Sequence, residues 1–164
     1  MKRAFLVALV AALSGCAGFS GSDLVAGQST AQDVIKSMGT PHEKLEGGGG
    51  SIWLYSRLPE GRATFAVTLG PDGVLRSIEQ RLTRENVYKL VAGTTTEKQV
   101  RELLGPPGSV STMERQARKV WEYKMLEEPN LMILWVQFSN DGVVREVLYM
   151  RDPEQDKNSG ASMS

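Results

Sequence analysis

Apolar residues follow two different periods along this chain, and turn residues separate the segments. Spacings of three and four, typical of one helical face, follow Thr30, at Val34, Ile35 and Met38, and follow Thr96, at Val100, Leu103 and Leu104. Shorter apolar segments, some with the alternation typical of half-buried strands, predict strands at Ile52 to Leu58, Thr64 to Leu69, Val74 to Gln80, Lys119 to Leu126, Leu131 to Phe138 and Val143 to Met150. The pattern predicts an α+β fold in which short helices pack on antiparallel strands.

Capping residues bound each of these two helices. Thr30 is the predicted N-cap of the first, with Asp33 in the capping-box position, and Gly39 ends the helix before Pro41. The second helix repeats the arrangement with Thr96, Gln99, Gly105 and Pro107. A helix of about two turns is not stable by itself. Each is therefore expected to pack its apolar stripe on a sheet.

The chain contains an internal repeat. Leu24–Pro41 recurs as Leu90–Pro107, and Trp53-Leu54-Tyr55 recurs as Trp121-Glu122-Tyr123. Such repeats indicate tandem structural units. We therefore predict two units, residues 23–82 and 83–152, each a short helical pair packed on an antiparallel β-meander. A helix over residues 84–91 would begin the second pair, and the polar residues 153–164 are predicted to be disordered.

The first residues have the composition of an export signal. Lys2 and Arg3 precede an apolar run, which ends in Leu13-Ser14-Gly15-Cys16. This ending resembles the lipobox of bacterial lipoproteins, whereas an ordinary signal peptide would need only small residues at the cut. The resemblance implies removal of residues 1–15 by cleavage between Gly15 and Cys16, and attachment of a diacylglycerol and an N-acyl chain to Cys16. Several acyl chains together anchor a protein stably to a membrane.

The residue that follows Cys16 indicates to which membrane the protein is anchored. In Gram-negative lipoproteins an aspartate at this position usually retains the protein in the inner membrane, and this chain has Ala17 there. The resemblance therefore implies the outer membrane, with the protein lipid-anchored on its periplasmic side. Residues 16–22 are small and rich in Gly and Ser, so they are predicted to form a flexible tether.

Charge and residue usage argue against several functions. The chain has 19 Lys and Arg against 19 Asp and Glu, so no basic field favours nucleic acid as a partner. Its single cysteine allows no disulfide framework, and its single histidine, His42, gives neither a zinc ligand set nor a convincing catalytic base. We therefore expect no enzymatic activity, no metal and no cofactor other than the acyl chains.

The repeat as a whole is similar to a known family. The pattern Gly-(x)₂-Thr-(x)₃-Val-(x)₄-Gly-x-Pro, followed by Trp-x-Tyr and by a strand ending in Asp-Gly-Val, resembles the SmpA/OmlA (BamE-like) family of outer-membrane lipoproteins. It is also found in the β-lactamase-inhibitor-protein-like fold. The second copy, from Leu82 to Pro107, is the closer match. The resemblance implies a link to the outer-membrane β-barrel assembly machinery, although the family has one unit and this chain has two.

Three apolar residues are candidates for a partner-binding surface. Trp135 alternates with inward-facing residues, so it is predicted to face away from the core, where the first repeat has Ala66. The strand containing Leu148 and Met150 is apolar on both faces. Either the other repeat or the tail covers these side chains, or they bind a partner, since Trp is enriched in interface hot spots.

Two functions follow from these predictions. The first is an envelope scaffold that binds other proteins, with a link to outer-membrane protein assembly. The alternative is an inhibitor-like lipoprotein that binds a periplasmic enzyme through its sheet face.

Overall fold

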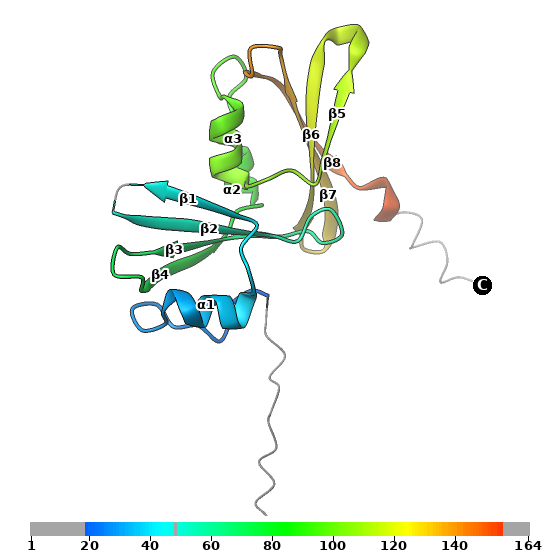
Figure 1. Cartoon of the computed structure of the whole chain (residues 1–164). Coiled ribbons are helices and arrows are strands. Elements are labelled where there is room, and N and C mark those ends of the chain that lie inside the picture. Colours follow the sequence, from blue (N-terminus) through cyan, green and yellow to red (C-terminus); the bar gives the residue numbers. More distant parts are fainter. Residues whose placement is uncertain (1–18, 48, 156–164) are drawn as a thin grey trace, which may run out of the picture.

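A computed structural model describes residues 19–47 and 49–155. Gly15 and Cys16, the predicted cleavage and lipidation residues, lie outside this part of the chain. The described residues form an α+β fold with two four-stranded antiparallel sheets, as the alternating pattern predicts (Figure 1). None of the helices in this part is long and apolar enough to cross a membrane.

The N-terminal sheet consists of four consecutive strands, β1 (Glu43–Gly47), β2 (Gly50–Ser56), β3 (Thr64–Leu69) and β4 (Leu75–Gln80), in spatial order β1-β2-β3-β4. Helix α1 (Ala31–Met38) packs on one face. Its buried residues Val34 and Met38 join the core formed by Trp53, Tyr55, Val67, Leu69 and Leu75.

The C-terminal sheet has the same topology, with β5 (Ser109–Met113), β6 (Arg118–Glu127), β7 (Asn130–Phe138) and β8 (Val144–Arg151) in spatial order. A 3₁₀ turn (Glu114–Gln116) connects β5 to β6. Helices α2 (Arg84–Val87) and α3 (Glu97–Leu104) contribute Val87, Val100 and Leu104 to a second core. The strands contribute Trp121, Tyr123, Met125, Met132, Leu134, Val136, Phe138 and Val144.

The predicted helix caps are confirmed. Thr30 and Thr96 are the N-caps of α1 and α3, each in a complete capping box with Asp33 or Gln99. Each helix ends at a glycine of positive φ, 83° at Gly39 and 84° at Gly105, which disfavours any residue with a Cβ. The amphipathic spacing of the sequence therefore sets the limits of both helices correctly.

A tyrosine from the sheet fixes the end of each helix. Tyr55 donates a hydrogen bond to the carbonyl oxygen of Gly39, and Tyr123 donates one to that of Gly105, both at 3.1 Å. Both tyrosine side chains are fully buried. The repeated Trp-x-Tyr motif is therefore structural, because Trp53 and Trp121 are also buried in the two cores.

Three local features differ from the prediction. A helical pair forms only in the C-terminal half, since the described residues before α1 form turns. The helix predicted over residues 84–91 ends at Val87. Strand β5 has no alternating apolar signal and was not predicted, because nearly all its side chains are exposed.

Two segments predicted to be flexible contact the folded halves where the structure describes them. Phe19 packs on the N-terminal core. At the other end, the Gln155 side chain accepts a hydrogen bond from the amide of Leu131 at 2.9 Å. The described parts of the predicted tether and tail are therefore attached to the fold.

The loop between β2 and β3 joins the two halves. Its Leu58 packs against the C-terminal core. Arg62 donates hydrogen bonds to the carbonyl oxygens of Met125, at 3.4 Å, and Met132, at 3.2 Å, and forms an ion pair with Asp152. Asp152 is only 1% exposed. A second ion pair, between Arg101 of α3 and Glu43 of β1, joins the halves at 2.8 Å.

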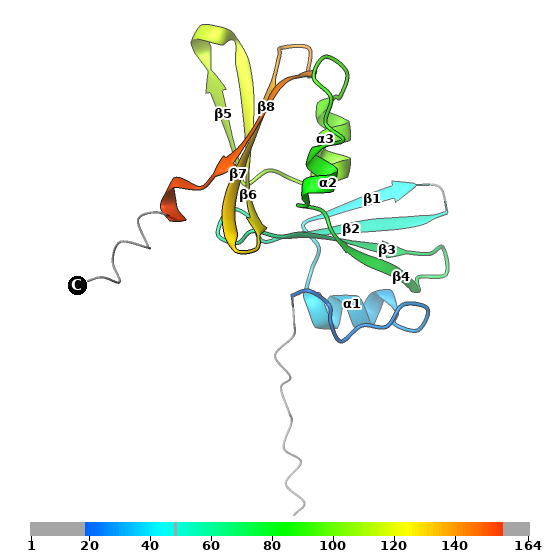
Figure 2. The ribbon, with the colours of Figure 1, turned by 180° about the vertical axis from the view of Figure 1, so that it is seen from behind.

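These contacts place α2 and α3 on the face of the N-terminal sheet opposite α1 (Figures 1 and 2). On that face Leu54 and Ala66 are fully buried. The N-terminal sheet is thus covered on both faces, by its own helix and by the other half of the chain.

We predict that Tyr123→Phe lowers the free energy of unfolding by about 1–2 kcal/mol, because the buried Gly105 carbonyl loses its hydrogen-bond donor. Urea denaturation followed by circular dichroism measures the change. The matched control is Tyr88→Phe, which removes the same hydroxyl from a side chain that is 71% exposed. Equal stability of the two variants would show that the tyrosine bond contributes nothing.

We predict that Arg62→Met lowers the free energy of unfolding by about 3 kcal/mol at neutral pH, because it leaves Asp152 buried without a cation. Burial alone would raise the pKa of Asp152, but the hydrogen bond and charge of Arg62, with the Glu154 amide, hold it below its ordinary value. A lowered carboxyl pKa stabilises the fold above the unfolded-state pKa. The advantage of the wild type should therefore shrink as the pH falls below about 4.

The pH series uses urea denaturation of both proteins between neutral pH and pH 3. Arg76→Met is the control, since its ion pair with Asp72 is exposed and should contribute little at any pH. A stability difference that stays constant down to pH 3 would contradict the role given to the Asp152 carboxylate.

Candidate functional site

The face of the C-terminal sheet opposite α3, called here the outer face, differs from the other sheet faces. Strand register places Trp135 of β7 between Glu122 of β6 and Leu148 of β8. Two residues along, Ile133 lies between Lys124 and Met150. Trp135, Ile133, Leu148 and Met150 are each only half-buried. Apolar side chains from two adjacent strands therefore form a continuous strip that solvent reaches.

A hydrogen bond holds the largest side chain of this strip. The indole Nε1 of Trp135 donates to Oε2 of Glu122 at 2.8 Å. An indole with its one donor satisfied presents a rigid apolar surface, and its ordering on binding costs little entropy. Trp135 is therefore pre-oriented on the outer face.

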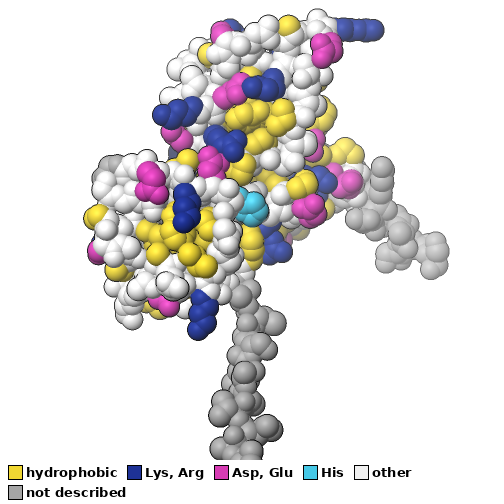
Figure 3. Space-filling model, viewed as in Figure 1, with side chains coloured by type: hydrophobic (Ala, Val, Ile, Leu, Met, Phe, Trp, Pro, Cys, Tyr) yellow, Lys and Arg dark blue, Asp and Glu magenta, His cyan; other side chains and the backbone are white. Residues whose placement is uncertain are grey.

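Charged residues of both signs surround the strip, and they pair with one another. Lys124 forms an ion pair with Glu154 at 3.3 Å. Arg118 donates hydrogen bonds to Glu146 and Gln137, both at 2.8 Å. An apolar centre within a polar rim is the general composition of a protein-binding surface. The mixture of signs gives no basic surface for anionic lipid or nucleic acid. Figure 3 shows the same mixture of acidic and basic side chains over the face of the molecule that it presents.

The corresponding positions of the N-terminal sheet show why its face opposite α1 is closed to solvent. Ala66 and Leu54 occupy the places of Trp135 and Glu122, and both are fully buried beneath the C-terminal half. At this contact a Cβ added to Gly105 would lie 2.6 Å from the Thr64 side chain, so the Gly105 backbone packs closely against that side chain. A tryptophan in place of Ala66 would not fit there.

The structure brings together the three partner-binding candidates named from the sequence. Trp135, Leu148 and Met150 all lie on the outer face. Their role in binding stays a prediction. The sequence analysis missed Ile133 and Leu126, which lie on the same face, and Leu126 is 45% exposed. Both alternate with residues of the predicted core, so period-two spacing alone could have identified them.

The titratable side chains have structural explanations. Burial raises the pKa of Tyr55 to about 12. Burial, followed by a hydrogen bond and charge from Glu127, also raises the pKa of Tyr149 to about 12. His42 is exposed, and its Nδ1 accepts a hydrogen bond from the amide of Ser56 at 3.3 Å. Within residues 19–47 and 49–155, no three His, Cys, Asp or Glu side chains are grouped closely enough to hold a metal ion.

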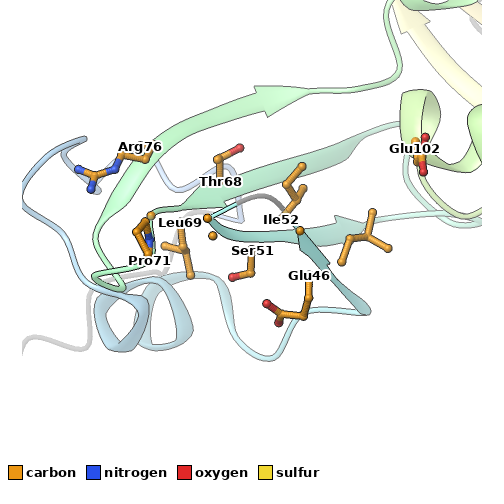
Figure 4. Close-up of a pocket in the computed structure, with 13 residues that line it drawn as sticks. Glu46, Ser51, Ile52, Thr68, Leu69, Pro71, Arg76 and Glu102 are labelled. Carbon is orange, nitrogen blue, oxygen red and sulfur yellow. The ribbon is translucent and has the colours of Figure 1, made fainter.

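A pocket of about 560 Å³ lies at the hairpin end of the N-terminal sheet, beside Glu102 of α3 (Figure 4). Ile52 and Thr68 point to one side of the sheet, whereas Ser51 and Leu69 point to the other (Figure 4). The polar side chains of this pocket do not point to a common centre. Arg76 forms a hydrogen bond with Asp72 at 2.7 Å, and Glu102 faces Lys98. This pocket is a weaker candidate than the outer face, because binding sites usually need a few convergent polar groups.

No protein-family model and no curated protein matches the sequence. Two solved structures are similar. A DUF4309 family protein (YjgB) from Bacillus subtilis is 20% identical with a TM-score of 0.32, covering 80% of this chain and 84% of that one. A "putative beta-lactamase inhibitor protein" from Streptococcus mutans is 16% identical with a TM-score of 0.31, covering 74% and 82%.

These comparisons correct the family inferred from the sequence. The resemblance to the SmpA/OmlA family is wrong, because no family model matches and the similar solved structures are described as other proteins. The repeated Gly, Thr and Pro positions that suggested it are helix caps here, which unrelated proteins share for physical reasons. The expected link to the β-barrel assembly machinery depended on that resemblance and is withdrawn with it.

We predict that Trp135→Ala lowers the free energy of unfolding by about 1–2 kcal/mol, whereas Trp121→Ala lowers it by about 3–5 kcal/mol. Trp121 is buried in the C-terminal core, but Trp135 is half-exposed on the outer face. Urea denaturation of the purified variants measures both changes. Equal losses would mean that Trp135 belongs to the core and that the outer face is not a free surface.

Proposed function

We propose that this protein is a non-enzymatic lipoprotein of the outer membrane that binds a folded periplasmic protein through the outer face of its C-terminal sheet. The observation that carries the proposal is the solvent-accessible strip of Trp135, Leu148, Ile133 and Met150. The mixed, paired charges around this strip favour a protein partner over a lipid surface. The lipobox-like residues before Cys16 support the membrane anchor.

Of the two functions considered from the sequence, binding to a soluble periplasmic enzyme suits this surface better than a place in membrane-protein assembly. The strip lies on β7 and the edge strand β8, and paired charged residues flank it, as in complexes between folded soluble proteins. The scaffold function keeps no observation of its own once the family resemblance is withdrawn.

The test places a photo-crosslinking amino acid at position 148 in the lipidated protein, in living cells. We expect one crosslinked protein. In cells that are not irradiated, washing the membrane with salt should release the same protein as a soluble species. The same amino acid at position 88 is the control, because Tyr88 is also exposed but lies outside the outer face. The affinity of the identified partner for Trp135→Ala should then be at least about 30-fold weaker than for the wild type.

Three results separate the parts of this proposal. Unchanged affinity for Trp135→Ala and Leu148→Ala would show that the outer face is not the binding site. A crosslinked integral barrel protein would replace the soluble partner with a membrane-assembly role. Membrane fractionation of Cys16→Ala protein tests the anchor separately, since a variant that still sediments with membranes is not held by lipid on Cys16.

A further inference from the structure

Residues 19–23, the first described residues after the predicted lipidation site, are packed against the fold. The Phe19 ring lies 6.3 Å from the rings of both Tyr55 and Phe65, in edge-on arrangements with interplanar angles of 86° and 61°. The guanidinium carbon of Arg57 lies 4.7 Å above the Phe19 ring. Phe19 is thus enclosed between the N-terminal core and a cation, and both contacts are favourable.

The next residues of the segment are also held. Gly21 is buried with a φ of 65°, and a Cβ at this position would lie 2.6 Å from the Ile78 side chain. Asp23 accepts a hydrogen bond from the Ser37 hydroxyl of α1 at 2.5 Å. Three successive contacts therefore attach residues 19–23, called here the docked segment, to α1 and its sheet.

We propose that the docked segment orients the protein on the membrane, with the α1 side of the N-terminal half facing the bilayer. This inference rests on the proposed lipidation of Cys16. Only residues 17 and 18 then separate the lipidated cysteine from Phe19, a span of at most about 10 Å. A six-residue flexible tether would instead have let the protein rotate freely at about 13 Å.

The contacts between the two halves also fix where the proposed binding surface lies relative to the membrane. Arg62 and Asp152 hold the C-terminal half on the side of the N-terminal sheet opposite α1. Figure 1 shows α1 and the first described residues at one end of the molecule, and the C-terminal sheet at the other. The docked segment thus holds the C-terminal sheet, and with it the outer face that carries Trp135, at the end of the molecule remote from the lipid, where a soluble partner can reach it.

The experiment measures the distance from the C-terminal half to the membrane. The lipidated full chain carries Ser111→Cys on exposed strand β5, and a dye on this cysteine transfers energy to acceptor-labelled lipid in phosphatidylethanolamine vesicles. Cys16 is the only native cysteine and its lipid blocks it, so the dye labels one site. We expect one narrow distance distribution for the wild type, and a distribution roughly twice as broad for Phe19→Ser.

Two further variants keep the result interpretable. Inserting Gly-Gly-Ser between residues 17 and 18 leaves every docking contact intact, and should move the dye outward by at most about 10 Å. Ser22→Ala changes an exposed residue of the same segment and should match the wild type. If Phe19→Ser and the wild type give the same distribution, the docked segment does not orient the protein.

Docking is measured without lipid in the soluble Cys16→Ser chain. There Phe19→Ser should raise the unfolding equilibrium constant roughly tenfold, because a half-buried aromatic side chain is lost from the core. An unchanged constant would overturn the docking itself. Failure of the wild type to bind vesicles would instead refute only the proposed anchor, since the soluble measurement does not depend on it.

Discussion

Each sheet of this protein has two faces, but each half of the chain supplies helices for only one of them. A half-covered sheet leaves apolar side chains in water, and the two halves resolve this differently. The N-terminal sheet buries its second face, with Leu54 and Ala66, beneath the C-terminal half. The C-terminal sheet leaves its second face open. The joint through Arg62 and Asp152 decides which face is covered, so the candidate binding surface depends on it.

The repeat explains how similar local structures acquire different surroundings. Both helices begin with a threonine capping box, and both end where a sheet tyrosine binds a glycine carbonyl. At the outer-face positions, in contrast, the copies differ, with Ala66 and Leu54 in one and Trp135 and Glu122 in the other. Small and apolar residues permit close packing of the halves, whereas the tryptophan and its carboxylate partner suit a surface that solvent reaches.

Similar capping chemistry is also why the family resemblance was misleading. Gly-(x)₂-Thr, with its glycine three residues before the N-cap, and Gly-x-Pro after the helix are requirements of a short helix between two turns. They specify how that helix starts and stops on a sheet, and say little about what the protein binds. The residues that carry the functional proposal, Trp135, Leu148 and Ile133, are outside the motif.

The sequence by itself determined the limits of α1 and α3, most strands and the outward direction of Trp135, because caps and period-two alternation act over a few residues. It did not determine β5, whose exposed side chains carry no periodic signal, or the docking of Phe19, which lies in a Gly- and Ser-rich stretch. Only the tertiary structure decided that the face of the N-terminal sheet opposite α1 is covered, whereas the outer face of the C-terminal sheet is not. That choice depends on contacts between residues as distant in sequence as Arg62 and Asp152, which no local pattern encodes.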